Sequence, residues 1–84
     1  MKINQMAVFR EEPDGRGCLF NPDDGKVFGL NRTACMIWKE LSAGSSIAGI
    51  ISMLKEAGGA GEGVEKDVDT FISSLRERGF LEEA

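Results

Sequence analysis

The first third of the chain consists of short apolar runs separated by turn-forming residues. The runs cover residues 7–11, 17–21 and 26–30. The turns between them, at residues 12–15 and 21–25, each carry proline near the start and glycine at the end. Proline presets one backbone angle of a tight turn and glycine tolerates the angles at its end, so each segment reverses the chain. The pattern predicts a three-stranded antiparallel meander.

After residue 30 the apolar residues follow the spacing of helices. Asn31 is a good N-cap, and the helix that it begins has its apolar face in Ala34, Ile37, Trp38 and Leu41. The same spacing recurs in Ile47, Ile50, Ile51 and Leu54. A third helix is predicted over residues 64–78, with its apolar face in Val64, Val68, Phe71, Ile72 and Leu75. Gly79 ends this helix, and a frayed tail is expected at residues 82–84.

Strands followed by helices predict an α+β, winged-helix-like fold, with a three-stranded antiparallel sheet followed by three helices. The 84 residues suit a single domain, with its core at about residues 7–81. No histidine is present, which excludes Ser-His-Asp triads, Cys-His pairs and metal sites that need histidine. No pair of carboxylates faces the core. The sequence therefore predicts neither an enzyme nor a cofactor or metal.

The apolar runs are too short to span a membrane, and the N-terminal residues lack the apolar region of a signal peptide. These features predict a cytoplasmic protein without a membrane partner. Cys18 and Cys35 are then expected to be buried free thiols, because a secreted scaffold of this size usually carries more cysteines.

The predicted outline raises DNA binding, with the third helix in the major groove. The net charge of −4 lies in residues 61–84, where seven acidic residues outnumber three basic ones. Phosphate contacts need lysine and arginine, and the start of the third helix has mainly acidic residues. The sequence therefore predicts no nucleic-acid partner, and a winged-helix DNA-binding regulator stays the alternative function.

The third predicted strand is apolar on both faces, in Val27, Phe28 and Leu30, and contains no proline that would block further pairing. Either helices cover both of its faces or one side is left for a partner. A peptide could add to its edge as a further strand and gain main-chain hydrogen bonds there. A second copy of the chain could use the same edge to form a dimer.

Four segments together resemble the PqqD family: residues 8–12, 19–31, 34–41 and 67–81. The most specific parts are the run from Leu19 to Asn31, which leads into a helix with Ile37 and Trp38, and the closing Gly79-Phe80-Leu81. The resemblance covers nearly the whole chain. The glycine-rich segment at residues 57–63 departs from it, and so puts the placement of the third helix in doubt.

The resemblance implies a small non-catalytic domain that binds the leader segment of a ribosomally made precursor peptide. Such domains present the precursor to a modifying enzyme, often a radical SAM protein, and serve several peptide products. The leader is expected as a strand on the third strand of the sheet, contacting Lys26, Val27, Phe28, Gly29 and Leu30. The opposite wall of the groove is expected from the third helix, in Asp67, Phe71, Ser74, Leu75 and Arg78.

Within that implied groove, Asp67 and Arg78 are expected to fix the two ends of the peptide electrostatically. The apolar stripe of the third helix is broad, so which of Phe71, Ile72 and Leu75 faces the groove rather than the core stays open at this point.

Overall fold

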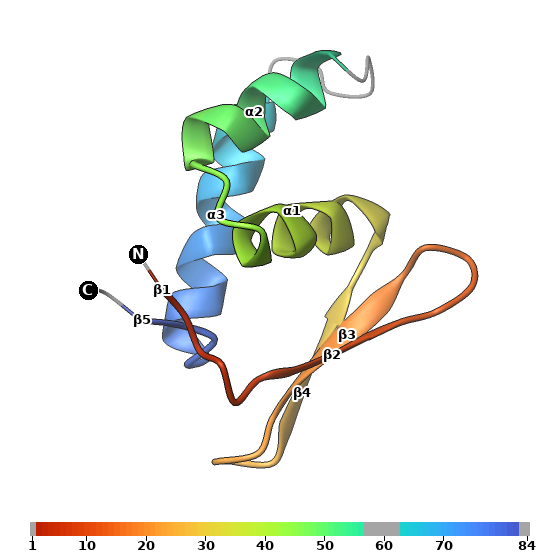
Figure 1. The fold of residues 1–84 in the computed structure, drawn as a ribbon, viewed down its shortest axis with the longest axis vertical. Coiled ribbons are helices and arrows are strands. Elements are labelled where there is room, and N and C mark those ends of the chain that lie inside the picture. The colour runs from red at the N-terminus through yellow and green to blue at the C-terminus, as the bar shows by residue number, and fades with distance from the viewer. Residues whose placement is uncertain (1, 57–62, 83–84) are drawn as a thin grey trace.

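The predicted meander and the three predicted helices are present in the structure (Figure 1). The computed structural model describes residues 2–56 and 63–82 of the chain. The α+β prediction, with an antiparallel sheet followed by three helices, is confirmed. The elements follow one another in the order β1 (Lys2–Ile3), β2 (Val8–Glu11), β3 (Gly17–Asn21), β4 (Lys26–Leu30), α1 (Arg32–Ser42), α2 (Ile47–Glu56), α3 (Val64–Glu77) and β5 (Leu81–Glu82).

The main sheet has the order β2–β3–β4, with both pairs antiparallel. Because successive side chains of a strand point to opposite faces, the register sorts the side chains into cross-strand rows. The row that faces the helices is Phe9, Leu19 and Phe28. The neighbouring row, which faces away from the helices, is Val8, Phe20 and Val27, and all three side chains are exposed.

The helices supply most of the core. Asn31 caps α1 as predicted, and its Oδ1 accepts a hydrogen bond from the Ala34 N–H at 2.8 Å. Trp38 is buried, as its place on the apolar face of α1 indicates. The buried core residues of the described chain are Leu19, Leu30, Cys35, Ile37, Trp38, Leu41, Ile50, Leu54, Val64, Val68, Ile72, Leu75, Phe80 and Leu81.

The two cysteines are free thiols, as predicted, but only one is buried. Cys35 lies in the core, and burial raises the pKa of its thiol. Cys18 is half-buried because it lies on the face of β3 that points away from the helices. The prediction that both thiols are buried is therefore wrong for Cys18.

A second, two-stranded sheet joins the two ends of the described chain. β1 pairs antiparallel with β5, with Lys2 opposite Glu82 and Ile3 opposite Leu81. Figure 1 shows the N- and C-terminal ends side by side as a result. The prediction of a frayed tail is thus wrong at Glu82, which forms a strand, while residues 83 and 84 lie outside the described residues. The glycine-rich segment also lies outside them, except for Gly63.

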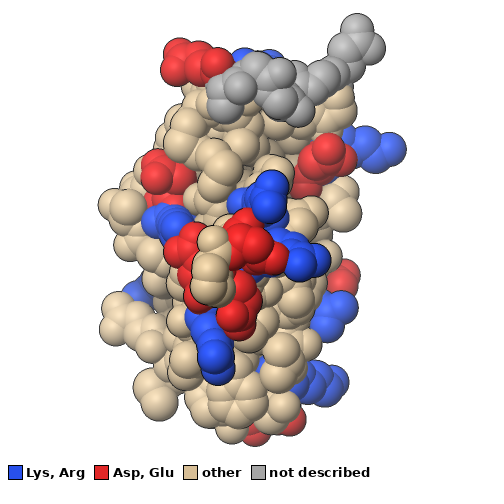
Figure 2. Space-filling model, turned by 90° about the vertical axis from the view of Figure 1, so that its right-hand side faces the viewer, with Lys and Arg blue, Asp and Glu red and all other residues tan. Residues whose placement is uncertain are grey.

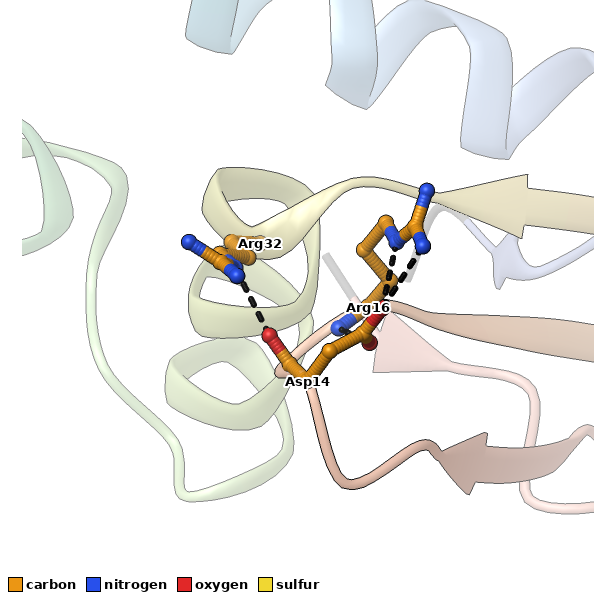
Figure 3. A network of polar contacts seen from close by, with 3 residues as sticks. All are labelled: Asp14, Arg16 and Arg32. Carbon is orange, nitrogen blue, oxygen red and sulfur yellow. Dashed lines mark hydrogen bonds and ion pairs between the residues drawn. The ribbon is translucent and has the colours of Figure 1, made fainter.

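The turn between β2 and β3 is fixed to the first turn of α1 by a polar network (Figure 3). The Asp14 carboxylate accepts from Arg16 Nε at 2.8 Å and lies 2.7 Å from Arg16 Nη2. Arg32 Nε of α1 donates to the Asp14 carbonyl oxygen at 2.7 Å. The hydrogen bonds from Arg16 lower the pKa of Asp14 below its ordinary value of 3.8. None of the described helices is both long enough and apolar enough to cross a membrane.

Candidate functional site

β4 has an open edge. It pairs with β3 on one side, and no described residue donates or accepts a ladder hydrogen bond on its other side. Its five residues include one charged side chain, Lys26 at the start, and no proline. Such an edge presents unpaired N–H and C=O groups to any extended chain that reaches it.

Three aromatic or cationic side chains gather around Phe28 on β4: one from the middle of α3 and two from the residues that follow this helix. The Phe28 ring lies 6.0 Å from the Phe71 ring and 6.3 Å from the Phe80 ring, centroid to centroid. These distances are typical of favourable aromatic pairs. The guanidinium carbon of Arg78 lies 4.6 Å from the centroid of Phe28, within the range of a cation–π contact. We call Phe28, Phe71, Arg78 and Phe80 the β4–α3 cluster.

The end of α3 is held against the sheet by Asn21, the last residue of β3. Its Nδ2 donates to the Arg78 carbonyl oxygen at 3.2 Å, and its Oδ1 accepts from the Asp23 N–H at 3.0 Å. Gly79 follows in the left-handed region, with φ of +81°. A Cβ at Gly79 would lie 3.1 Å from Asn21 Nδ2, so glycine is needed both for its backbone angle and for this close approach. The contact between Asn21 and the end of α3 therefore fixes the position of Arg78 relative to the sheet.

The residues predicted for the strand wall divide between the two faces of β4. Phe28 is half-buried and points toward the helices, whereas Val27 is 61% exposed and points away from them. Lys26 and Gly29 are exposed. Leu30 is buried in the core, so only its backbone is positioned to meet a ligand.

The residues predicted for the helix wall divide in the same way, and the structure resolves which part of the stripe faces β4. Phe71 is half-buried and contacts Phe28, whereas Ile72 and Leu75 lie in the core. Leu75 has no exposed surface, because it lies on the side of α3 that packs inward. It supports the wall from behind and does not line it. The half-buried Ser74 lies one turn after Phe71.

Charge along α3 changes sign from its start to its end. Glu65 and Asp67 are exposed in the first turn, while Arg78, at the C-cap, lies over Phe28. A hydrogen bond from Lys55 Nζ of α2 lowers the pKa of Glu65. Figure 2 shows acidic and basic side chains interleaved on the face to which the β2–β3 turn projects, rather than a continuous basic surface. This distribution does not favour binding to a phosphate backbone.

Two residues of the site were not predicted as site residues. Phe80, which the sequence marks only as part of the closing Gly79-Phe80-Leu81, is the buried floor beneath Phe28 and makes an edge contact with Trp38. The sequence predicts Asn21 as the last residue of the second strand and the first of the following turn, with no role in the site. The available signal was its place at the end of an apolar strand, where a buried amide needs partners.

The described residues hold no group of three or more metal-binding side chains. The Cys35 thiol is buried and its pKa is raised, which is the opposite of what a nucleophilic cysteine needs. What the site offers is an edge of main-chain hydrogen-bonding groups beside an aromatic surface with one cation. That combination suits the binding of an extended peptide.

Comparison with known proteins agrees with this geometry. A family model described as Coenzyme PQQ synthesis protein D (PqqD) matches residues 17–81. Among solved structures, the chain is similar to one described as TbiB1 in complex with the TbiA(beta) leader peptide, with 26% sequence identity and a TM-score of 0.88. That similarity covers 100% of this chain and 98% of the other. A search of curated protein sequences gives no match.

Proposed function

Since the chain belongs to the PqqD family, we propose that it binds the leader segment of a ribosomally synthesised precursor peptide and presents the precursor to a modifying enzyme. The leader adds as a fourth strand to the open edge of β4, in the groove between β4 and α3. The observation that carries the proposal is the β4–α3 cluster, which places Phe28, Phe71 and Arg78 beside an edge without a partner among the described residues. The similarity to a leader-peptide complex supports it.

Each part of the site has a distinct role in this proposal. The backbone of residues 26–30 gives affinity through main-chain hydrogen bonds that do not depend on the peptide sequence. Phe28 and Phe71 form an apolar surface for one inward-pointing peptide side chain, and Ser74 lies beside it. Arg78 at one end of α3 and Asp67 at the other attract opposite charges, which gives the bound peptide a preferred direction.

The protein itself is proposed to be non-catalytic and cytoplasmic, and to work with a separate enzyme. A radical SAM enzyme is the first candidate partner, and other peptide-modifying enzymes are alternatives. The domain raises the local concentration of the precursor at that enzyme, because both bind the same adaptor.

An NMR titration of isotopically labelled protein tests the proposal. The ligands are synthetic copies of the N-terminal halves of short peptides encoded beside this protein and, separately, a random DNA duplex. We expect the peptide alone to shift the amide signals of residues 26–30 and of α3, and to slow hydrogen exchange along β4. Shifts with DNA only would favour the regulator, and peptide-induced shifts confined to other surfaces would place the site elsewhere.

Sedimentation of the same samples distinguishes peptide binding from pairing between copies of the chain. The proposal predicts a mass that does not change with protein concentration. A dimer that dissociates as peptide is added would show that a second copy uses the same edge.

A further inference from the structure

The outer face of the main sheet carries an apolar row that the β4–α3 cluster does not use. The large apolar side chains exposed among the described residues are Met6, Val8, Phe20, Val27 and Met36. Three of them, Val8, Phe20 and Val27, lie directly opposite one another on neighbouring strands. Single exposed apolar residues are ordinary, but a contiguous row on one face indicates a contact surface.

Gly29 leaves a gap on the same face, two residues after Val27 and opposite Cys18. Its φ is not positive, and a Cβ placed on it would meet no atom within 4 Å. Neither the backbone nor the packing of the protein therefore requires glycine here. Glycine weakens the interior of a strand, and where it is found there it often marks the close approach of a ligand or of another backbone.

A surface hollow of about 420 Å³ opens at this gap. Its lining includes Cys18 of β3 and Gly29 and Leu30 of β4, and the β2–β3 turn contributes polar side chains, among them Glu12 and Arg16. The hollow is continuous with the open edge of β4, because Gly29 and Leu30 belong to both. Space of this size beside an apolar row suits a large side chain rather than a small one.

We propose that Val27 and Gly29 form an outer subsite that holds one large apolar side chain of the bound peptide. This inference rests on the proposed binding of a peptide strand at β4. Side chains of an added strand alternate between faces, so its residue opposite Gly29 projects over the gap and against Val27. An aromatic or long apolar residue there covers the glycine and extends the row of Val8, Phe20 and Val27. The bound peptide strand then carries two apolar side chains that the protein recognises, one on the face of Phe28 and one on the face of Gly29. Because these faces are opposite, the two peptide residues are separated by an odd number of positions.

Selection from a peptide library tests the outer subsite. Random peptides long enough to span β4 are displayed on phage and selected on the wild-type protein, on Gly29→Val and on Arg10→Val. Arg10→Val is the matched control, because Arg10 and Gly29 lie opposite Cys18 on its two sides. We expect the wild type and Arg10→Val to select large apolar residues at one inward and one outward position, and Gly29→Val to keep only the inward preference.

Affinity and stability together separate a filled subsite from a damaged fold. A peptide selected on the wild type should bind Gly29→Val about tenfold more weakly. The melting temperature of Gly29→Val should be equal to or above that of the wild type, because valine favours a strand more than glycine does. Replacing the outward peptide residue by alanine should remove the difference between the two proteins.

Two outcomes overturn different claims. The same consensus and the same affinity on wild type and on Gly29→Val would refute the outer subsite while leaving peptide binding at β4 intact. If no peptide is enriched on the wild type, or if Phe28→Ala binds the enriched peptides as tightly as the wild type does, the proposed function itself fails.

Discussion

The two edge strands of the main sheet share a partner strand and differ in chemistry. β2 presents Arg10 and Glu11, and both are ion-paired: Arg10 with Glu12 at 3.4 Å, and Glu11 with Lys39 of α1 at 2.6 Å. β4 presents Val27, Phe28 and Gly29 after a single lysine. Charges on an edge oppose the addition of a further strand, whereas an uncharged edge permits it. The comparison indicates that the β2 edge of the sheet is protected against the addition of a further strand, whereas the β4 edge is available for it.

The register makes this comparison testable residue by residue. Phe9 and Phe28 lie on either side of Leu19, both half-buried and both packed against the core. Val8 and Val27 lie on either side of Phe20 in the same way. A change on β2 is therefore a control for the same change on β4, because the two positions differ mainly in what lies beyond the edge.

The largest expected effect is from Phe28→Ala compared with Phe9→Ala. Each variant should lower the free energy of unfolding by about 1–3 kcal/mol, because each removes a half-buried ring. Phe28→Ala should also weaken peptide binding roughly 30- to 100-fold, since a central aromatic anchor is lost. Urea denaturation and fluorescence anisotropy with a labelled peptide measure the two quantities. Equal losses of affinity in both variants would contradict the difference between the edges.

A smaller effect is expected from Gly79→Ala, which disturbs the contact that positions Arg78. A left-handed backbone costs a residue with a Cβ about 1–2 kcal/mol, and the new methyl group also meets the Asn21 amide. Gly44→Ala is the control, because Gly44 has a similar φ of +90° and no atom within 4 Å of an added Cβ. We expect both variants to lose stability in urea denaturation, and only Gly79→Ala to lose peptide affinity. Retained affinity in Gly79→Ala would show that the contact with Asn21 does not position the site.

Arg78→Met should have a modest effect. It keeps the apolar stem of the side chain and removes the charge over Phe28, a contact that contributes about 0.5–1 kcal/mol at an exposed position. Peptide affinity should fall a few-fold, and its dependence on salt should become shallower, as measured by titrations at two ionic strengths. Arg10→Met, which removes an exposed cation from the opposite edge strand β2, should leave both unchanged.

The smallest effect is expected from lowering the pH, which acts on Asp14 in the turn between β2 and β3. The pKa of Asp14 is lowered by its hydrogen bonds to Arg16, so the ionised carboxylate stabilises the fold at pH values above the ordinary 3.8. That stability is lost as the pH falls through the lowered pKa. Asp14→Asn should therefore melt slightly below the wild type at neutral pH, and the difference should shrink as the pH falls below 3.8 and through the lowered pKa. A difference that persists in acid would show that the network in Figure 3 does not depend on this charge.

The strands and helices of the main fold could be predicted from the sequence because local signals agree there. Proline and glycine mark both hairpin turns, Asn31 caps α1, and Trp38 lies on a regular apolar face. β1 and β5 could not be predicted, because two residues each are too few to show an alternating pattern. The pairing of Lys2 with Glu82 depends on contacts between distant parts of the chain, which no local signal carries.

The candidate site was only partly predictable for a related reason. Phe71, Ile72 and Leu75 all fit one apolar stripe, and periodicity cannot tell a side chain that faces β4 from one that faces the core. The packing of α3 against the rest of the fold decides that Phe71 contacts Phe28 while Leu75 is buried. The Asn21 amide takes part in this packing, because it donates a hydrogen bond to the end of α3.

The pairing of β1 with β5 allows the chain to be closed into a ring. Because Lys2 and Glu82 are cross-strand neighbours, a short linker can join the two ends without displacing either strand. Cyclisation restricts the unfolded chain more than the folded one and should therefore raise the melting temperature. New ends can then be opened in the exposed turn at Asp23 and Asp24, between β3 and β4. In such a permuted chain, the strand that offers the open edge would begin close to the new N-terminus.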